Sequence, residues 1–181
     1  MENLGKAIFE HYEKYLGEML GADSYPDQSI QLMGYQDAVE NCLTFATMGL
    51  SLHRKEIGSC CEAVLTAEED FDSCADLFMK VLSYIIAEGL PLSRGMAIGG
   101  IDSLNPVFFG KYHKSALYFT EPTMFTGGFR QVNDQCRIYM AFFISPEEEA
   151  YLRKNGAEAF EKRLEEGKAD IIDLNRPAVC S

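Results

Sequence analysis

The sequence predicts an α+β fold in which a mixed or largely antiparallel sheet is covered by helices. Apolar residues recur every three or four positions in several segments, which indicates amphipathic helices. Other short segments are rich in β-branched and aromatic residues, which favours strands. The two kinds of segment do not alternate regularly, as they would in a parallel α/β fold. A chain of 181 residues is long enough for one domain with a substantial core.

The first 37 residues are predicted to form one helix and a connection. An apolar stripe with helical spacing runs from residue 3 to residue 20, and Gly21 follows it as a stop signal. Residues 22–37 hold Gly, Asp, Ser and Pro in turn-like groups, so they are expected to be irregular. We therefore expect residues 1–37 to pack on a main domain formed by residues 38–181.

Two strands and a long helix are expected next. Residues 42–50 and 60–66 favour strands, and the polar loop between them permits an antiparallel pairing. In the second strand, alternate residues from Cys61 onward would share one face and those from Glu62 onward the other. The helix is expected to begin with Asp72 or Ser73 as its cap and to end at Gly89.

The region after this helix is rich in glycine and aromatic residues. Its turn-forming pairs delimit short strand candidates near residues 96–98, 106–109 and 115–120. Residues 137–144 are almost all apolar, which is typical of a central strand covered on both faces.

The strongest local signals come from the last quarter of the chain. Ser145 is predicted to cap a helix, with Pro146 in its first position and Glu148 completing a capping box. A second short helix is expected over residues 157–166, followed by an extended tail over 170–179.

The composition disfavours several functions. A net charge of −12 and a pI near 4.6 disfavour nucleic acid and anionic membranes and favour basic partners, although the charge could serve solubility alone. No apolar run is long enough to span a membrane, and residues 1–6 lack the features of a signal peptide. A cytoplasmic location is therefore expected.

No cofactor or metal is predicted. The six cysteines include no C-x-x-C pair and are expected to be free thiols. The acidic residues around Asp70 do not have EF-hand spacing, and the glycine pairs do not form a phosphate-binding loop. Catalysis by cysteine with histidine would need His11, His53 or His113 beside a thiol, and no spacing in the sequence places them there.

The order of segments in the second half resembles the suppressor-of-fused-like domain family. The similarity covers roughly residues 38–179. The similar segments in the second half are the apolar strand 137–144, Ser145-Pro146-Glu147-Glu148-Glu149, the helix end 151–156 and the tail 170–177. Upstream, the similar segments are Thr47–Ser51, Cys61–Thr66 and Gly89–Ile101. The resemblance implies a compact α+β domain that binds proteins and carries no catalytic motif. It also implies similarity to short bacterial members that are thought to include immunity proteins against secreted toxins.

These observations together predict a non-catalytic protein-binding domain, of immunity or regulatory type, that neutralises a partner such as a basic toxin. The expected contact residues are Glu62, Glu68, Glu69, Asp70, Asp72 and Arg176. For Arg176, an internal ion pair with Asp170 or Asp173 is the alternative to an exposed anchor. Two other functions stay open, a small-molecule sensor lined by the aromatic residues of 106–129 and a Cys/His hydrolase. The oligomeric state is left open.

Overall fold

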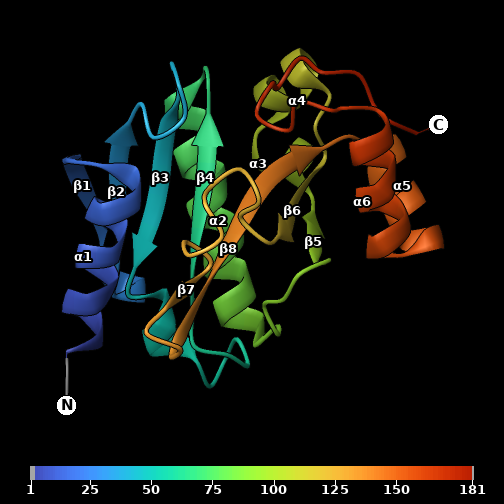
Figure 1. The fold of residues 1–181 in the computed structure, drawn as a ribbon. Helices are drawn as coiled ribbons and strands as arrows, with labels where there is room; N and C mark the ends of the chain where they lie inside the picture. Colours follow the sequence, from blue (N-terminus) through green and yellow to red (C-terminus); the bar gives the residue numbers. More distant parts are fainter. Residues whose placement is uncertain (1–2, 181) are drawn as a thin grey trace.

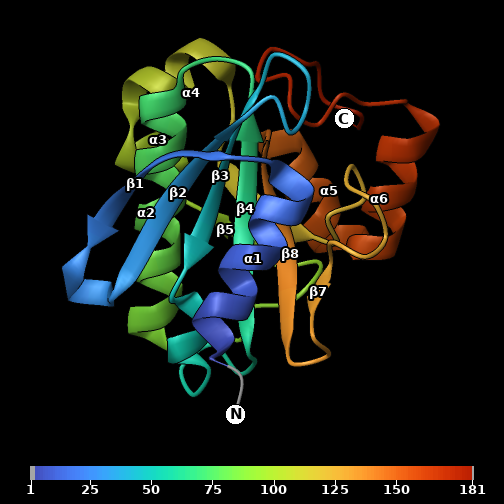
Figure 2. The ribbon, with the colours of Figure 1, turned by 60° about the vertical axis from the view of Figure 1, so that its left-hand side comes forward.

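A computed structural model describes residues 3–180 as a mixed sheet with helices on both faces (Figures 1 and 2). The strands are β1 (Met19–Tyr25), β2 (Ile30–Gln36), β3 (Leu43–Met48), β4 (Cys61–Ala67), β5 (Ala97–Gly99), β6 (Ala116–Thr120), β7 (Gln131–Val132) and β8 (Cys136–Ile144). The helices are α1 (Leu4–Leu16), α2 (Phe71–Glu88), α3 (Ile101–Leu104), α4 (Pro106–Tyr112), α5 (Pro146–Asn155) and α6 (Ala157–Glu166), with short 3₁₀ turns at Pro26–Gln28 and Leu50–His53. The α+β prediction is confirmed.

The sheet has the strand order β1-β2-β3-β4-β8-β6-β5, and β7 pairs with β8 beside this path. β3 and β4 pair in antiparallel fashion, as the sequence permits, with Leu43 opposite Ala67. β4 and β8 form the parallel pair of the sheet, with Cys61 opposite Arg137. β8 is central and buried, which confirms the prediction for residues 137–144.

Each face of the sheet carries its own hydrophobic core. On one face, Cys61, Ala63 and Leu65 of β4 pack with α2, α3 and α4. On the other face, Val64 packs with α1, α5 and α6. This confirms the alternation predicted for β4. Figures 1 and 2 show α1 and α2 on opposite sides of the strands.

The N-terminal prediction is wrong in part. The helix ends at Leu16 because Gly17 takes a φ of 91°, a conformation that favours glycine. Residues 22–37 are not an irregular connection, since β1 and β2 form a hairpin there. β2 also pairs with β3 across the expected boundary at 37/38, with Gln36 opposite Leu43. Residues 1, 2 and 181 of the two expected units lie outside the described residues.

Three further expectations need correction. α2 begins at Phe71, and Asp70 precedes it with a left-handed φ of 51° in place of a cap at Asp72 or Ser73. Residues 106–109 belong to helix α4, because the side chain of Asn105 caps the N–H of Phe108 at 3.0 Å. The tail 170–179 contains bends and turns and no strand.

The local signals around α5 and α6 are confirmed. Ser145 Oγ accepts a hydrogen bond from the N–H of Glu148 at 3.3 Å, and Glu148 Oε2 accepts one from the N–H of Ser145 at 3.0 Å. α6 covers residues 157–166 as expected, with Phe160 and Leu164 buried. Over residues 3–180, no helix combines the length and the apolar character that crossing a membrane requires.

Candidate functional site

Glu62, an expected contact residue, is fully buried in β4. Thr47 Oγ1 donates a hydrogen bond to its carboxylate at 2.7 Å. The backbone N–H groups of residues 49–51 donate three more, at 3.1, 3.2 and 3.1 Å. Burial raises the pKa of Glu62, and these hydrogen bonds oppose that rise. Glu62 therefore holds the turn after β3, and the expectation that it is exposed to a partner is wrong.

Arg176 is also buried, with 6% of its surface exposed. Its Nη1 and Nη2 atoms donate to the two carboxylate oxygens of Glu148 at 2.5 and 3.0 Å, and Nη2 lies 3.4 Å from the carbonyl oxygen of Phe143. The reading of Arg176 as an exposed anchor is wrong. The internal ion pair exists, but its partner is Glu148 and neither Asp170 nor Asp173. This pair fixes the tail against the first turn of α5.

A buried lysine adds to this attachment of the tail. Lys114 Nζ donates to the carbonyl oxygen of Arg176 at 3.0 Å, and the lysine side chain is almost completely enclosed. Burial, followed by the positive charge of Arg176, lowers the pKa of Lys114 to about 8. Lys114, Glu148 and Arg176 therefore serve the fold, and they present no charged group to a partner.

The other expected contact residues lie at the surface where β4 leads into α2. Glu68 and Asp72 are exposed, and Glu69 and Asp70 are partly exposed. The structure brings two carboxylates of the tail, Asp170 and Asp173, near Glu68. Partial desolvation, followed by the charges of Asp170, Asp173 and Glu69, raises the pKa of Glu68. We define the acidic rim by its residues: Glu68, Glu69, Asp70, Asp72, Asp170 and Asp173.

Two contacts fix one carboxylate of the acidic rim in place. Asn175 Nδ2 donates to Glu69 Oε1 at 2.5 Å, which ties the tail to the end of β4. Lys111 Nζ of α4 lies 3.6 Å from Glu69 Oε2. The side chains of Glu69 and Lys111 are both about half exposed, so this ion pair neutralises only part of the charge of the rim.

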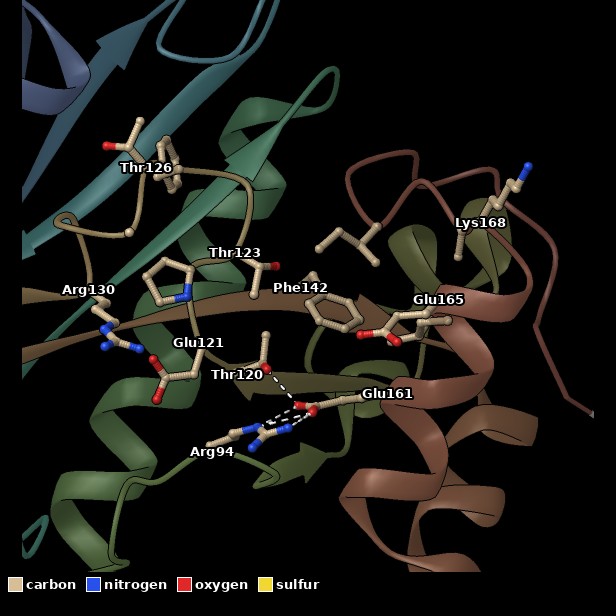
Figure 3. A pocket seen from close by; sticks show the side chains of 16 residues that line it. Arg94, Thr120, Glu121, Thr123, Thr126, Arg130, Phe142, Glu161, Glu165 and Lys168 are labelled. Carbon is tan, nitrogen blue, oxygen red and sulfur yellow. Dashed lines mark hydrogen bonds and ion pairs between the residues drawn. The ribbon is translucent and has the colours of Figure 1, made fainter.

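A cleft of about 690 Å³ lies between the loop that follows β6 and helix α6 (Figure 3). Its lining residues are Arg94, Thr120, Glu121, Pro122, Thr123, Phe125, Thr126, Gly127, Arg130, Phe142, Glu161, Leu164, Glu165, Lys168, Ala169 and Ile171. Of the aromatic residues in 106–129, Phe125 is the one that lines this cleft, while Phe108, Tyr118 and Phe119 are buried in the core.

Glu161 is the most strongly bound charged group of the cleft. Arg94 pairs with it through Nε and Nη2, and Thr120 Oγ1 and Tyr118 OH donate to it at 2.6 and 2.9 Å. Figure 3 shows Arg94 and Thr120 joined to the same carboxylate. Burial opposes ionisation, but the hydrogen bonds from Arg94, Thr120 and Tyr118 lower the pKa of Glu161 overall. Glu161 is therefore ionised at neutral pH and orients Arg94 at the cleft.

The cleft and the acidic rim share one segment of chain. Ala169 and Ile171 line the cleft, whereas Asp170 and Asp173 act on Glu68. The two features therefore meet at residues 169–173. The consecutive acidic residues Glu68, Glu69 and Asp70 already indicate the acidic rim in the sequence. The cleft has no such signal, because Arg94 and Glu161 are 67 positions apart.

Each histidine that the alternative hydrolase would need has a hydrogen-bond partner other than a thiol. His11 Nε2 and His53 Nε2 lie 2.9 and 2.5 Å from backbone carbonyl oxygens, and His113 Nε2 lies 3.3 Å from Glu147. Burial raises the pKa of both Cys61 and Cys74 to about 12, so these thiols are protonated at neutral pH. Within the described part of the chain, no group of three or more His, Cys, Asp or Glu side chains is placed to hold a metal.

Comparison with known proteins gives the family and supports the fold. The model of the family "Suppressor of fused protein (SUFU)" matches residues 26–177. The crystal structure of a protein from Neisseria gonorrhoeae FA 1090, described as a SUFU homolog, superimposes with a TM-score of 0.79 at 11% sequence identity, covering 98% of this chain and 97% of the other. Among curated proteins, none matches the sequence. Because the family model spans most of its length, the chain belongs to the suppressor-of-fused family.

Proposed function

We propose that the chain is a non-catalytic protein-binding domain whose contact surface is the acidic rim together with the adjoining cleft. The partner in this proposal is a protein with a basic surface, such as a toxin or a regulator, and the domain acts as an immunity-type or regulatory protein that neutralises it. Membership of the suppressor-of-fused family supports this class of function.

The observation that carries the proposal is the like charge gathered in the acidic rim. Asp170 and Asp173 come from the tail and Glu68 from the end of β4, so the fold brings distant carboxylates together. Like charges at close range repel one another. A basic partner would relieve this repulsion and would be attracted from a distance, so its association rate should fall as salt increases.

The test begins with affinity capture from the native host and identification of the partner. Binding is then measured with purified proteins for the triple variant Glu68→Gln, Asp170→Asn, Asp173→Asn. A matched control, Glu18→Gln, Glu56→Gln, Glu88→Gln, removes the same charge from exposed positions elsewhere. We expect the rim variant to associate at least about tenfold more slowly at low salt and the control to behave nearly like the wild type.

Two outcomes would contradict the proposal. One is equal binding by the rim variant and the control, which would remove the rim from the interface. The other is a native host that yields no stable protein partner. If the partner is a toxin, co-expression of this chain should restore growth to cells that produce it, and the rim variant should restore growth less well.

A small-molecule sensor is the second candidate. The cleft volume of about 690 Å³ lies within the usual range for ligand pockets, about 300–1,000 Å³, and Phe125 and Phe142 supply apolar surface beside the polar groups. Thermal-shift measurements against a metabolite library test this candidate. A ligand that stabilises the wild type but not the Phe142→Ala variant would support it, and flat curves throughout would reject it.

A further inference from the structure

Two cysteines from distant parts of the sequence face each other at the start of the parallel strand pair. Cys61 of β4 is the register partner of Arg137 in β8, and the N–H of Arg137 donates to the carbonyl oxygen of Cys60 at 3.0 Å. Cys60 directly precedes β4 and Cys136 is the first residue of β8, so the two lie opposite each other, one position before the pair of Cys61 and Arg137. Burial, followed by the charge of Glu62 and then by the neighbouring Cys60 thiol, raises the pKa of the Cys136 thiol.

Both sulfur atoms lie on the same face of the sheet. Cys136 belongs to the core cluster on the α1 face, and Cys60 packs against that cluster. Cys61 belongs to the cluster on the α2 face. Successive side chains of a strand point to opposite faces, so Cys60 and Cys61 are directed away from each other although they are adjacent in sequence. The geometry favours a disulfide between Cys60 and Cys136 over one between Cys60 and Cys61.

The strand spacing is compatible with a covalent bond between the two sulfurs. Neighbouring strands lie about 4.7–4.9 Å apart, and disulfides span Cα separations of about 4.4–6.8 Å. Cys60 is partly exposed, whereas Cys136 is completely buried. A reagent in solution can therefore reach Cys60 first. Burial raises the pKa of Cys136, so the step in which Cys136 loses its proton and reacts with the product is the slow one.

We propose that Cys60 and Cys136 form a reversible dithiol modification site, which closes to an intramolecular disulfide on reaction with a small-molecule disulfide. The Cys60 thiolate attacks one sulfur of the reagent, whose S–S bond breaks and releases one thiolate that takes up a proton. The Cys136 thiol then loses its proton and attacks the Cys60 sulfur, which displaces the second thiolate. Two protein thiols are oxidised, and the reagent disulfide is reduced to two thiols.

Closing this bond would join the loop before β4 to the first residue of β8. These two segments lie 76 positions apart in the sequence, so the cross-link would restrict the unfolded chain strongly. We expect the melting temperature to rise by about 5 °C or more on oxidation and to return to its original value with dithiothreitol.

The test uses the purified full-length chain, first reduced and then treated with oxidised glutathione in the absence of air. After remaining thiols are alkylated, the protein is digested without reduction, and the linked peptides are sequenced by fragmentation in a mass spectrometer. We expect a linked pair that contains Cys60 and Cys136, an intact mass lower by two hydrogen atoms, and the rise in melting temperature.

Variants separate this site from general thiol oxidation. Cys60→Ser and Cys136→Ala should each lose the cross-link and the temperature shift, whereas Cys180→Ser should keep both. Peptide mapping of the wild type remains decisive if Cys136→Ala does not fold. A wild-type protein that gives a Cys60–Cys61 link, stable glutathione adducts without a cross-link, or no reaction would overturn the proposal.

Discussion

Glu148 and Arg176 form an ion pair in which the two side chains are 0% and 4% exposed. Removing one member of such a pair leaves the other charge buried without compensation. We expect Arg176→Met to lower the free energy of unfolding by about 3–5 kcal/mol, as measured by urea denaturation. Arg153→Met is the matched control, because Arg153 pairs with Glu149 at an exposed position and should cost at most about 1 kcal/mol. A Glu148→Gln, Arg176→Met double variant as unstable as Arg176→Met alone would contradict this account.

The same carboxylate should make stability sensitive to acid. Burial opposes ionisation of Glu148, but hydrogen bonds and the charge of Arg176 lower its pKa overall. A carboxyl group with a lowered pKa stabilises the fold above its unfolded pKa of about 4.3, and that contribution is lost as the pH falls through the folded pKa. We expect the gap in unfolding free energy between wild type and Glu148→Gln to narrow below about pH 4. A gap that stays constant from pH 7 to pH 3 would exclude this linkage.

At the scale of single elements, the cap of α5 joins the central strand to the C-terminal helices. Ser145 is buried and directly follows the last residue of β8. Its side chain caps helix α5. We expect Ser145→Ala to lower the free energy of unfolding by about 1 kcal/mol, because an N-terminal N–H of α5 loses its acceptor. Ser93→Ala, at an exposed position, should change it by less than about 0.5 kcal/mol in the same thermal or urea measurement.

The elements that the sequence predicts well are those with strong local signals. Ser145, Pro146 and Glu148 specify the start of α5 among themselves, and β8 is identified by its continuous apolar run. The hairpin β1–β2 is missed because Met19 continues the helical spacing beyond Gly17, where the backbone turns. α4 is missed although Asn105 and Pro106 form a cap and first position, because the aromatic residues that follow also favour a strand.

The candidate site is predicted in part for a similar reason. Charged residues are usually exposed, which is true of Glu68 and Asp72. Glu62 and Arg176 are exceptions because their partners lie far away in the sequence, in the turn at 49–51 and at Glu148. Pairings over such separations depend on the completed sheet, so the sequence alone does not reveal them.

At the scale of the whole molecule, the net charge of −12 should oppose the compact state through self-repulsion. Raising NaCl shortens the Debye length from about 10 Å at 0.1 M to about 3 Å at 1 M, so we expect the melting temperature to rise with salt. The rim variant Glu68→Gln, Asp170→Asn, Asp173→Asn should respond less than the control Glu18→Gln, Glu56→Gln, Glu88→Gln. If differential scanning calorimetry gave both variants the same dependence of melting temperature on salt, charge repulsion in the rim would be no greater than elsewhere on the surface.

The parallel pairing of β4 with β8 has a consequence for how the chain matures during synthesis. Until residues 136–144 have left the ribosome, β4 lacks this neighbour and offers unpaired N–H and C=O groups along one side. A truncated or stalled product would expose this unpaired strand edge, which promotes self-association. Chaperone demand should therefore be greatest for translation intermediates that end between the close of α2 and the beginning of β8.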